Sequence, residues 1–263
     1  MAGATGYIGK AVVAELLDRD YIVFAIVRKE NQLEYSDQSN LNVISLEIGE
    51  NSDWTKQLPR IDIIISCLAS RSGCERDANL VDYSLNSDLL DFGLKIELQH
   101  FIILSAICIQ KPKLSFQRAK LRFNGKLMAS GLKYSIVLPT AFFKSLSGQV
   151  NRIKNGKSFL VFGNGKRTSS LPISEIDLAK YIVNCIGSEE SWNKSLPVGG
   201  PGPAVTPIDQ AEMLFKIFDK PKKIKHISPR FFDFALVLLF PVSFLSLIHI
   251  SEPTRPRLIS YAV

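Results

Sequence analysis

Three glycines near the start of the chain, Gly3, Gly6 and Gly9, stand three positions apart in the run Gly-Ala-Thr-Gly-Tyr-Ile-Gly. Glycine lets a backbone turn tightly and approach a ligand closely. The amphipathic run that follows predicts a helix, whose first N–H groups and positive dipole end favour a phosphate. An ordinary tight turn is the alternative. The helix and the apolar strand pattern at 22–27 favour a mononucleotide-binding βαβ unit instead.

The residues of this turn that we expect to contact a nucleotide are Gly3, Thr5, Gly6, Tyr7, Ile8 and Gly9. Dinucleotide-binding folds commonly place an acidic residue about 20 residues further on, where it holds the ribose hydroxyls. This chain has Arg28 and Lys29 there instead. An arginine suits a 2′-phosphate, so the sequence favours NADPH over NADH. A solvated basic strand end is the second interpretation.

Apolar, β-branched runs typical of buried parallel strands recur along the first half of the chain, at 22–27, 43–46, 61–68, 101–106 and 134–138. Helical patterns lie between them at 80–98 and 115–127. This alternation predicts an α/β fold with a doubly wound parallel sheet. Ligands bind at the carboxyl ends of such strands. We therefore expect Cys67, Leu68 and Ala69, which end one of the runs, to border the cofactor.

The pattern changes after Pro139. The run at 159–162 leads into Gly163-Asn164-Gly165, which predicts a hairpin-type turn, and Ser174 predicts a capped helix start. We expect residues 1–139 to form a Rossmann-like NAD(P)-binding core and residues 140–235 a small substrate lobe packed on the sheet edge. The first strand of the core is expected ahead of Gly3, so the sequence predicts a truncated N-terminus with that strand missing or reduced to a stub.

The composition describes a globular chain of 263 residues, 46% of them hydrophobic, which suffices for one substantial core. The net charge of +7 fits either a basic surface or anionic ligands such as NADPH. No basic helix or basic-aromatic repeat is present, which argues against a nucleic-acid partner. The four cysteines form no C-x-x-C pair and the three histidines do not cluster, so no metal site is predicted. Cysteine usage favours a reducing compartment.

The C-terminal part combines five basic residues between 220 and 230 with an apolar run at 231–250. The run is barely long enough to span a bilayer, and Asp233, Pro241 and His249 argue against a span. A buried or membrane-surface helix is predicted instead. The basic residues form a solvated face or contact acidic lipid. Residues 244–263 resemble translated sequencing-adapter read-through, and we leave them out of the functional argument.

Beyond the glycine turn, the chain resembles the short-chain dehydrogenase/reductase family, in its atypical, NmrA-like branch. That family typically combines the turn with a Tyr-x-x-x-Lys motif and an upstream serine. Here Ser105 ends a strand pattern and Lys120 lies on a predicted helix, but Phe116 stands at the tyrosine position. The resemblance covers roughly residues 3–235. Among the runs that carry it are GATGYIGK (3–10), SCLASRSG (66–73), LSAICIQKP (104–112), FQRAKLRF (116–123), PTAFFKSLSGQV (139–150), FLVFGNG (159–165) and PVGGPGPAVTP (197–207).

Within this branch, the chain is similar to reductases of chlorophyll precursors. The resemblance implies NADPH-dependent reduction of the 8-vinyl group of a divinyl chlorophyllide or protochlorophyllide to an ethyl group, in (bacterio)chlorophyll biosynthesis. The partner is then a pigment, with peripheral membrane contact as a further expectation. A plastid is implied for a photosynthetic eukaryote and the cytoplasm for a bacterium.

The same resemblance implies roles for individual residues. Lys120 would hold the nicotinamide ribose and bias the local field, and Ser105 would touch the nicotinamide or the substrate. Pro139 borders the nicotinamide. The expected substrate-binding residues are Phe116, Thr140, Phe142 and Phe143. The competing interpretations are a surface lysine, an ordinary strand-end serine and, for the phenylalanines, core packing.

The phenylalanine at the tyrosine position is chemically consistent with a vinyl substrate. In a carbonyl reductase, the tyrosine protonates a developing alkoxide. A vinyl carbon has no oxygen to protonate, and hydride addition would place charge in the conjugated macrocycle. Phe116 would then offer a flat apolar wall to the ring. Two other functions remain open: an NADP(H)-binding redox sensor or assembly protein without turnover, and a reductase of phenolic or isoprenoid substrates.

Overall fold

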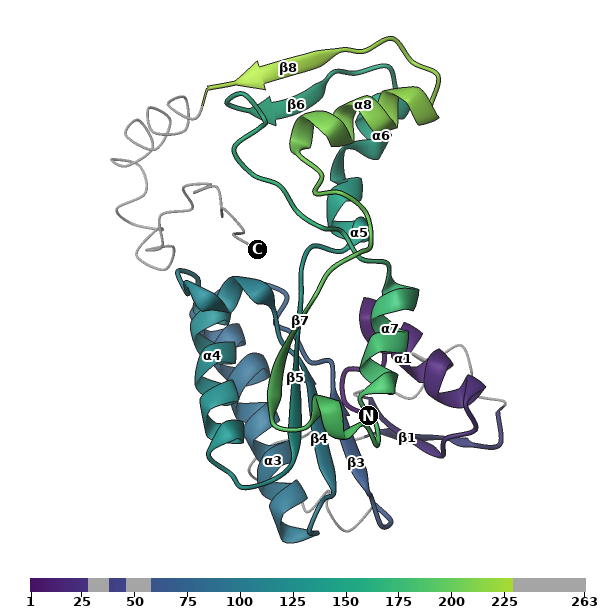
Figure 1. Ribbon diagram of the computed structural model, residues 1–263, viewed down its shortest axis with the longest axis vertical. Helices are drawn as coiled ribbons and strands as arrows, with labels where there is room; N and C mark the ends of the chain where they lie inside the picture. Colours follow the sequence, from purple (N-terminus) through teal and green to yellow (C-terminus); the bar gives the residue numbers. More distant parts are fainter. Residues whose placement is uncertain (28–37, 46–57, 229–263) are drawn as a thin grey trace. The chain divides into compact units, whose positions relative to one another are not determined.

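The computed structural model describes residues 1–27, 38–45 and 58–228, which separate into two units (Figure 1). The first unit comprises Met1–Thr140 and Ile173–Val198, and the second comprises Ala141–Pro172 and the residues from Gly199 onward. This division differs from the predicted continuous lobe at 140–235. Residues 173–198 return to the first unit because they supply one helix and one edge strand to its sheet.

The first unit is built on parallel strands only, as far as its described residues show. β1 pairs with β2, and the other four strands follow the order β3-β4-β5-β7. Ala2 joins the two groups through bridges to Ile26 and Ser66. The strands are β1 (Val23–Val27), β2 (Leu41–Ser45), β3 (Ile63–Ser66), β4 (His100–Leu104), β5 (Tyr134–Pro139) and β7 (Lys194–Val198).

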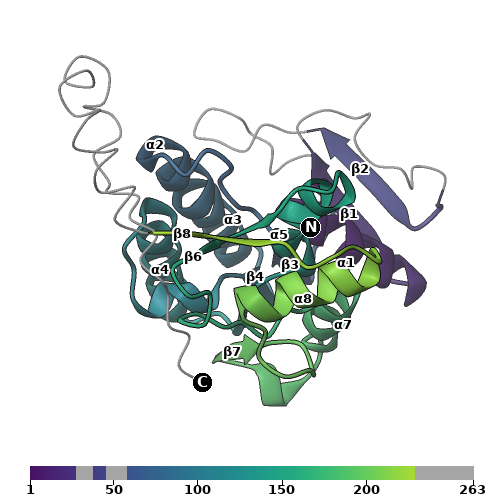
Figure 2. The ribbon, with the colours of Figure 1, turned by 90° about the horizontal axis from the view of Figure 1, so that it is seen from above.

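Helices cover both faces of this sheet, with α1 and α7 on one side and α3 and α4 on the other (Figures 1 and 2). The predicted doubly wound α/β fold is therefore confirmed. The helices are α1 (Tyr7–Asp18), α2 (Glu75–Asp77), the π-helical η3 (Ala78–Ser84), α3 (Leu85–Lys95), the 3-10 turn η4 (Ile107–Gln110), α4 (Ser115–Met128), α7 (Glu175–Asn184) and the 3-10 turn η6 (Glu189–Ser191).

Local sequence explains where these helices begin. The Gln117 side chain accepts hydrogen bonds from the N–H groups of Lys113 and Leu114 at 2.7 and 2.9 Å, which satisfies backbone donors just ahead of α4. Ser174 accepts one from the Asp177 N–H at 3.0 Å, so the predicted cap of α7 is confirmed. The helix predicted at 80–98 begins earlier, at Glu75, and passes through the π-helical turn η3.

One core cluster lies between the sheet and helices α3 and α4. Every residue of β4 is buried, as expected for a central parallel strand covered on both faces. The rings of Phe101 on β4 and Phe123 on α4 lie 5.9 Å apart, and neither side chain is exposed. This packing holds the carboxyl end of β4 and the middle of α4 at fixed positions, and with them Ser105 and Lys120.

A gap separates β1 from β3. Within the described residues, only Met1 and Ala2 lie between the two strands, and they occupy its carboxyl half. Ile26 N–H donates to the Met1 carbonyl, and Ala2 N–H donates to the Ile65 carbonyl, both at 2.9 Å. The amino half of the gap is a cavity of about 430 Å³. Its lining is mostly apolar and comes from both strands and from Leu16, Leu89 and Phe92.

The second unit contains a small parallel pair of strands, β6 with β8. The predicted hairpin after 159–162 is wrong. The Gly163–Gly165 turn is present, but the chain then passes through α8, and a crossover of this kind leads to a parallel partner. The elements are α5 (Phe143–Leu146), the 3-10 turn η5 (Ser147–Gln149), α6 (Val150–Lys154), β6 (Phe159–Phe162), α8 (Pro207–Ile217) and β8 (Ile224–Ile227).

Three sequence predictions concern residues outside the described ranges: Arg28, the helix at 231–250 and the artefact at 244–263. Among the helices that are described, none has the length and apolar character needed to cross a bilayer.

His100, at the start of β4, should make the fold sensitive to acid. The side chain is buried, with Nε2 2.9 Å from the Ser135 hydroxyl, and burial lowers its pKa from 6.5 to about 4. Between these values the unfolded chain binds a proton that the folded chain excludes. Stability should therefore fall as the pH drops from 6.5 to 4, by ~3 kcal/mol in total.

The measurement is urea unfolding at several pH values between 7 and 4. The variant His100→Gln, which cannot titrate there, should show a correspondingly flatter profile. An equal loss of stability in both proteins would contradict the assignment to His100.

Candidate functional site

The glycine turn is folded too tightly for side chains at two positions. Gly3 has a φ of +75°, and Gly6 N–H donates to its carbonyl at 3.0 Å. A Cβ at Gly9 would lie 2.0 Å from that same carbonyl oxygen. The turn leads into α1 with Gly6 as its N-cap, and no described side chain caps the helix. The arrangement suits an anion, which the helix dipole and backbone N–H groups would hold.

The loop after β3 adjoins this turn. A Cβ at Gly3 would lie 2.7 Å from the carbonyl of Cys67, so the two backbones are in direct contact. Cys67 is buried, and burial raises the pKa of its thiol to about 12, which makes it a neutral, apolar wall. Leu68 is half-buried and Ala69 is exposed at the carboxyl edge of the sheet. The structure thus brings residues 67–69 beside the glycine turn, at the carboxyl edge of the sheet.

The Tyr7 side chain has a structural partner on α7. Its hydroxyl donates to the Glu175 carboxylate at 2.5 Å, and the pKa of Tyr7 is raised to about 12, first by desolvation and then by that carboxylate. The bond ties the glycine turn to the helix supplied by residues 173–198. It helps to explain why that segment belongs to the first unit.

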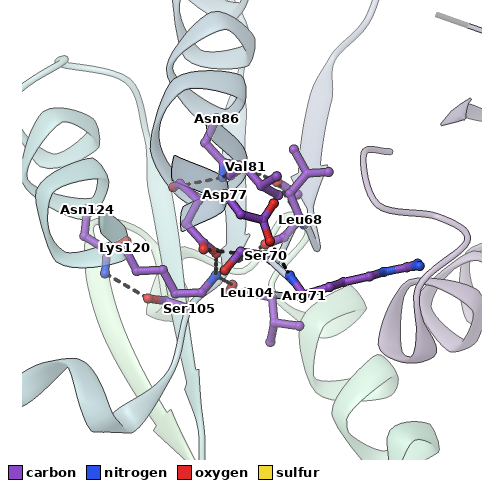
Figure 3. A network of polar contacts seen from close by, with 12 residues as sticks. Leu68, Ser70, Arg71, Asp77, Val81, Asn86, Leu104, Ser105, Lys120 and Asn124 are labelled. Atoms are coloured by element: carbon purple, nitrogen blue, oxygen red, sulfur yellow. Dashed lines mark hydrogen bonds and ion pairs between the residues drawn. The ribbon is translucent and has the colours of Figure 1, made fainter. Parts of the chain in front are cut away.

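Lys120 is a buried cation at the carboxyl edge of the sheet. It is only 5% exposed, and its Nζ lies 3.1 Å from Oδ1 of Asp82. Nζ also donates to the carbonyls of Leu68 and Leu104 at 3.3 and 3.4 Å (Figure 3). The ammonium group therefore combines two hydrogen bonds to backbone carbonyls with an ion pair to a buried carboxylate.

Ser105 follows β4 directly and lies beside Lys120 in the same network (Figure 3). Its backbone N–H donates to Val137 at 2.8 Å, which continues the sheet ladder one residue past the strand. Asn124 donates to the Ser105 hydroxyl at 3.1 Å. Asn124 and Lys120 are four residues apart on α4, so they share one helix face. The structure therefore brings the two predicted catalytic residues together.

Four polar residues of this network escaped the sequence analysis as site residues: Ser66, Asp82, Asn86 and Asn124. All four are buried, and Ser66 donates to Asn86 at 2.6 Å. A signal was present, because Asp82 and Asn86, like Lys120 and Asn124, are polar pairs at the helical spacing of four. Asp82 also lies in η3, and π-helical turns are frequent at functional sites.

The remaining predicted residues fall into two groups. Pro139 is buried at the end of β5, beside β4, and Thr140 continues that edge through a hydrogen bond to Val198 at 3.0 Å. Phe116 is half-buried on α4, one helical turn before Lys120. Phe142 and Phe143 belong to the second unit, where Phe143 is 55% exposed. Arg28 lies outside the described residues.

Comparison with known proteins agrees with this architecture. The chain is 42% identical to the chloroplastic divinyl chlorophyllide a 8-vinyl-reductase of Cucumis sativus, over 93% of this chain. It is 25% identical to the photosystem II assembly factor Ycf39 of Cyanophora paradoxa, over 75% of this chain. The chain spans 62% of the length of each of these relatives.

A solved structure of similar fold is the UDP-glucuronic acid 4-epimerase from Bacillus cereus in complex with NAD. Its TM-score is 0.75 at 17% identity, covering 86% of this chain and 85% of that one, which supports the fold alone. A family of proteins described as NAD(P)H-binding matches residues 3–189, a range that includes the glycine turn, Ser105 and Lys120. On the strength of this match and of the cradle formed by the turn, the chain belongs to the NAD(P)H-binding family.

Proposed function

We propose that the protein reduces the 8-vinyl group of a divinyl chlorophyllide or protochlorophyllide to an ethyl group, with NADPH as the hydride donor. The observation that carries this proposal is the 42% identity with the cucumber reductase along 93% of the chain. The buried cation and serine at the carboxyl edge of the sheet supply chemistry that suits it.

The residues present fit a nicotinamide dinucleotide. The turn at Gly3–Gly9 leaves no room for a Cβ at Gly9 and presents the start of α1 to an anion, as a pyrophosphate requires. When bound, the cofactor supplies the hydride. We assign the preference for NADPH to Arg28, whose guanidinium would pair with the 2′-phosphate.

The chain's own residues would bind the substrate and stabilise the charge that develops on it. Lys120 holds a positive charge at the strand ends in a water-poor setting, where it stabilises negative charge that develops in the conjugated ring. Ser105, oriented by Asn124, offers its hydroxyl at the same edge. Phe116 provides an apolar wall because no alkoxide forms that a tyrosine would protonate. The hydride and one proton together convert the vinyl group to an ethyl group.

The second unit is the proposed pigment-binding lobe. Phe142 and Phe143 lie where the chain enters this unit, and the exposed Phe143 ring offers apolar surface to a large planar ligand. For a source with plastids we propose the plastid, in line with the chloroplastic relative, with contact at a membrane surface where such pigments gather.

A redox sensor or assembly protein that binds NADP(H) without turnover is the second candidate. It is favoured by the similarity to Ycf39 and by the phenylalanine at position 116, which removes the usual proton donor of this family. The lower identity, 25% against 42%, ranks this candidate second.

Incubation with divinyl chlorophyllide a and NADPH, followed by chromatography, tests the proposal. We expect conversion to the monovinyl pigment, slower by about tenfold or more with NADH because a charge-assisted contact to the 2′-phosphate is lost. Lys120→Met should reduce conversion by a similar factor or more. NADPH binding without conversion would support the sensor instead.

A further inference from the structure

Asp82 is a buried carboxylate for which the proposed reaction has no direct use. Its side chain is fully buried in η3, with Oδ1 3.1 Å from Lys120 Nζ. Oδ2 accepts a hydrogen bond from the Ser70 N–H at 3.4 Å. Breaking a buried ion pair by removing one partner is costly, because the other charge is left uncompensated. Asp82 therefore constrains both Lys120 and the loop after β3.

The other two contacts of Lys120 extend this constraint. Leu68 lies in the loop after β3, and Leu104 ends β4 just before Ser105. The pair thus connects η3 and α4 to the two strand ends that border the candidate site. The neighbouring pair of Asn86 and Ser66 fixes the end of β3 in the same way, at 2.6 Å.

The position of the pair in the sheet indicates which half of the cofactor it affects. In doubly wound folds the dinucleotide crosses the carboxyl edge, with its pyrophosphate at the glycine turn. In such folds the end of the strand after the first helix holds the adenosine ribose, and here that strand is β1, which lies with β2 on one side of the turn. Lys120 lies at the ends of β3 and β4, on the opposite side of the turn. That side is left for the nicotinamide half.

We propose that Asp82 is a positioning residue that holds Lys120 and residues 67–70 in place for the nicotinamide half of the cofactor. The inference rests on the proposed NADPH-dependent function. Because Lys120 donates to two backbone carbonyls and is paired with a buried carboxylate, it acts through its charge and its hold on the Leu68 carbonyl, not as the proton donor.

The test is a pair of binding titrations on the full chain, which need no pigment. NADPH is titrated by its fluorescence, and 2′,5′-ADP, which lacks the nicotinamide half, is titrated by calorimetry. Asp82→Asn should weaken NADPH binding by about tenfold or more, the value of a charge-assisted contact, and leave 2′,5′-ADP binding within about twofold. Equal effects on both ligands, or no effect on either, would overturn the proposal.

A second Asp–Lys pair that reaches α4 provides a matched control. Asp91 of α3 pairs with Lys126 of α4 at 2.9 Å, but this pair is largely exposed. Asp91→Asn should therefore change neither titration, since exposed pairs contribute little. If it weakens NADPH binding as much as Asp82→Asn does, the effect is not specific to the buried pair and the proposal fails.

A second variant keeps the proposal testable if Asp82→Asn unfolds. Asp82→Leu combined with Lys120→Met removes both charges, which commonly preserves stability. We expect this double variant to melt close to the wild type while its NADPH affinity stays about tenfold lower. Wild-type NADPH affinity in the folded double variant would overturn the proposal. If the wild-type protein binds NADPH but does not convert the pigment, the proposed function alone is overturned. If the wild-type protein does not bind NADPH, both proposals are overturned.

Discussion

Replacing Gly9 with alanine should abolish nucleotide binding, with a rise of about 100-fold or more in the dissociation constant for NADPH. A Cβ at this position would lie 2.0 Å from the Gly3 carbonyl oxygen and 2.8 Å from its carbon. Both are backbone atoms, so no side-chain rotation relieves the clash, and the turn itself must open. Opening it would move the N–H donors that we propose hold the pyrophosphate, and loss of two charge-assisted hydrogen bonds is enough for about 100-fold.

Gly125→Ala is the matched control. Gly125 lies within α4, and no atom lies within 4 Å of where its Cβ would be. Alanine there should stabilise the fold by ~1 kcal/mol through helix propensity and leave binding unchanged. Fluorescence titration with NADPH and thermal unfolding of both variants provide the comparison. Equal affinity in the Gly9 and Gly125 variants would mean that the turn does not hold the cofactor.

Filling the gap between β1 and β3 should stabilise the folded protein. Five apolar, β-branched residues added ahead of Met1 can run parallel to both strands through the cavity of about 430 Å³. Each buried side chain contributes ~1.5–3 kcal/mol, against ~1–2 kcal/mol per residue for ordering the backbone. With the added ladder hydrogen bonds, we expect a net gain of ~2 kcal/mol, or a rise of ~4–8 °C in melting temperature.

The extension should also change the pH dependence of stability. The Met1 amine is buried against the Phe24 carbonyl at 2.7 Å, and desolvation lowers its pKa from 8.0 to about 6. The unfolded chain binds a proton in this range that the folded chain excludes, so stability falls as the pH drops from 8 to 6. Moving the amine out of the gap should remove this loss.

Thermal unfolding at pH 8 and pH 6 measures both effects. An extension of equal length that alternates proline and aspartate is the control, because proline cannot donate to the ladder and aspartate is costly to bury. If both extensions raise the melting temperature equally, the gain does not come from strand pairing in the gap.

Much of the fold could be predicted because its signals are local. The glycine turn is recognisable from three glycines, because only glycine fits where a side chain would clash with the backbone of the same turn. The β-branched runs are typical of strands buried on both faces. Ser174 was predicted as a helix cap because the capping bond spans only three residues. Lys120 and Ser105 were predicted through a family resemblance, and the structure places them in one network.

Pairings between distant segments were beyond the sequence patterns. Residues 173–198 return to the sheet because β7 finds its partner in β5, and the Tyr7 to Glu175 bond spans 168 positions. The sequence of β6 is typical of one strand of a hairpin, yet its partner is β8, about 60 residues later. The chain passes through α8 between the two strands, and such a crossover leads to a parallel pair.

By itself, then, the sequence determined a doubly wound nucleotide-binding fold and its glycine turn, and through a family resemblance it predicted two candidate catalytic residues. Only the tertiary structure decided that Lys120 is paired with Asp82, that it donates to the Leu68 and Leu104 carbonyls and that Asn124 orients Ser105. The physical reason is that a helical spacing of four shows which residues share a face, whereas the partner opposite that face depends on how helices pack against a common sheet.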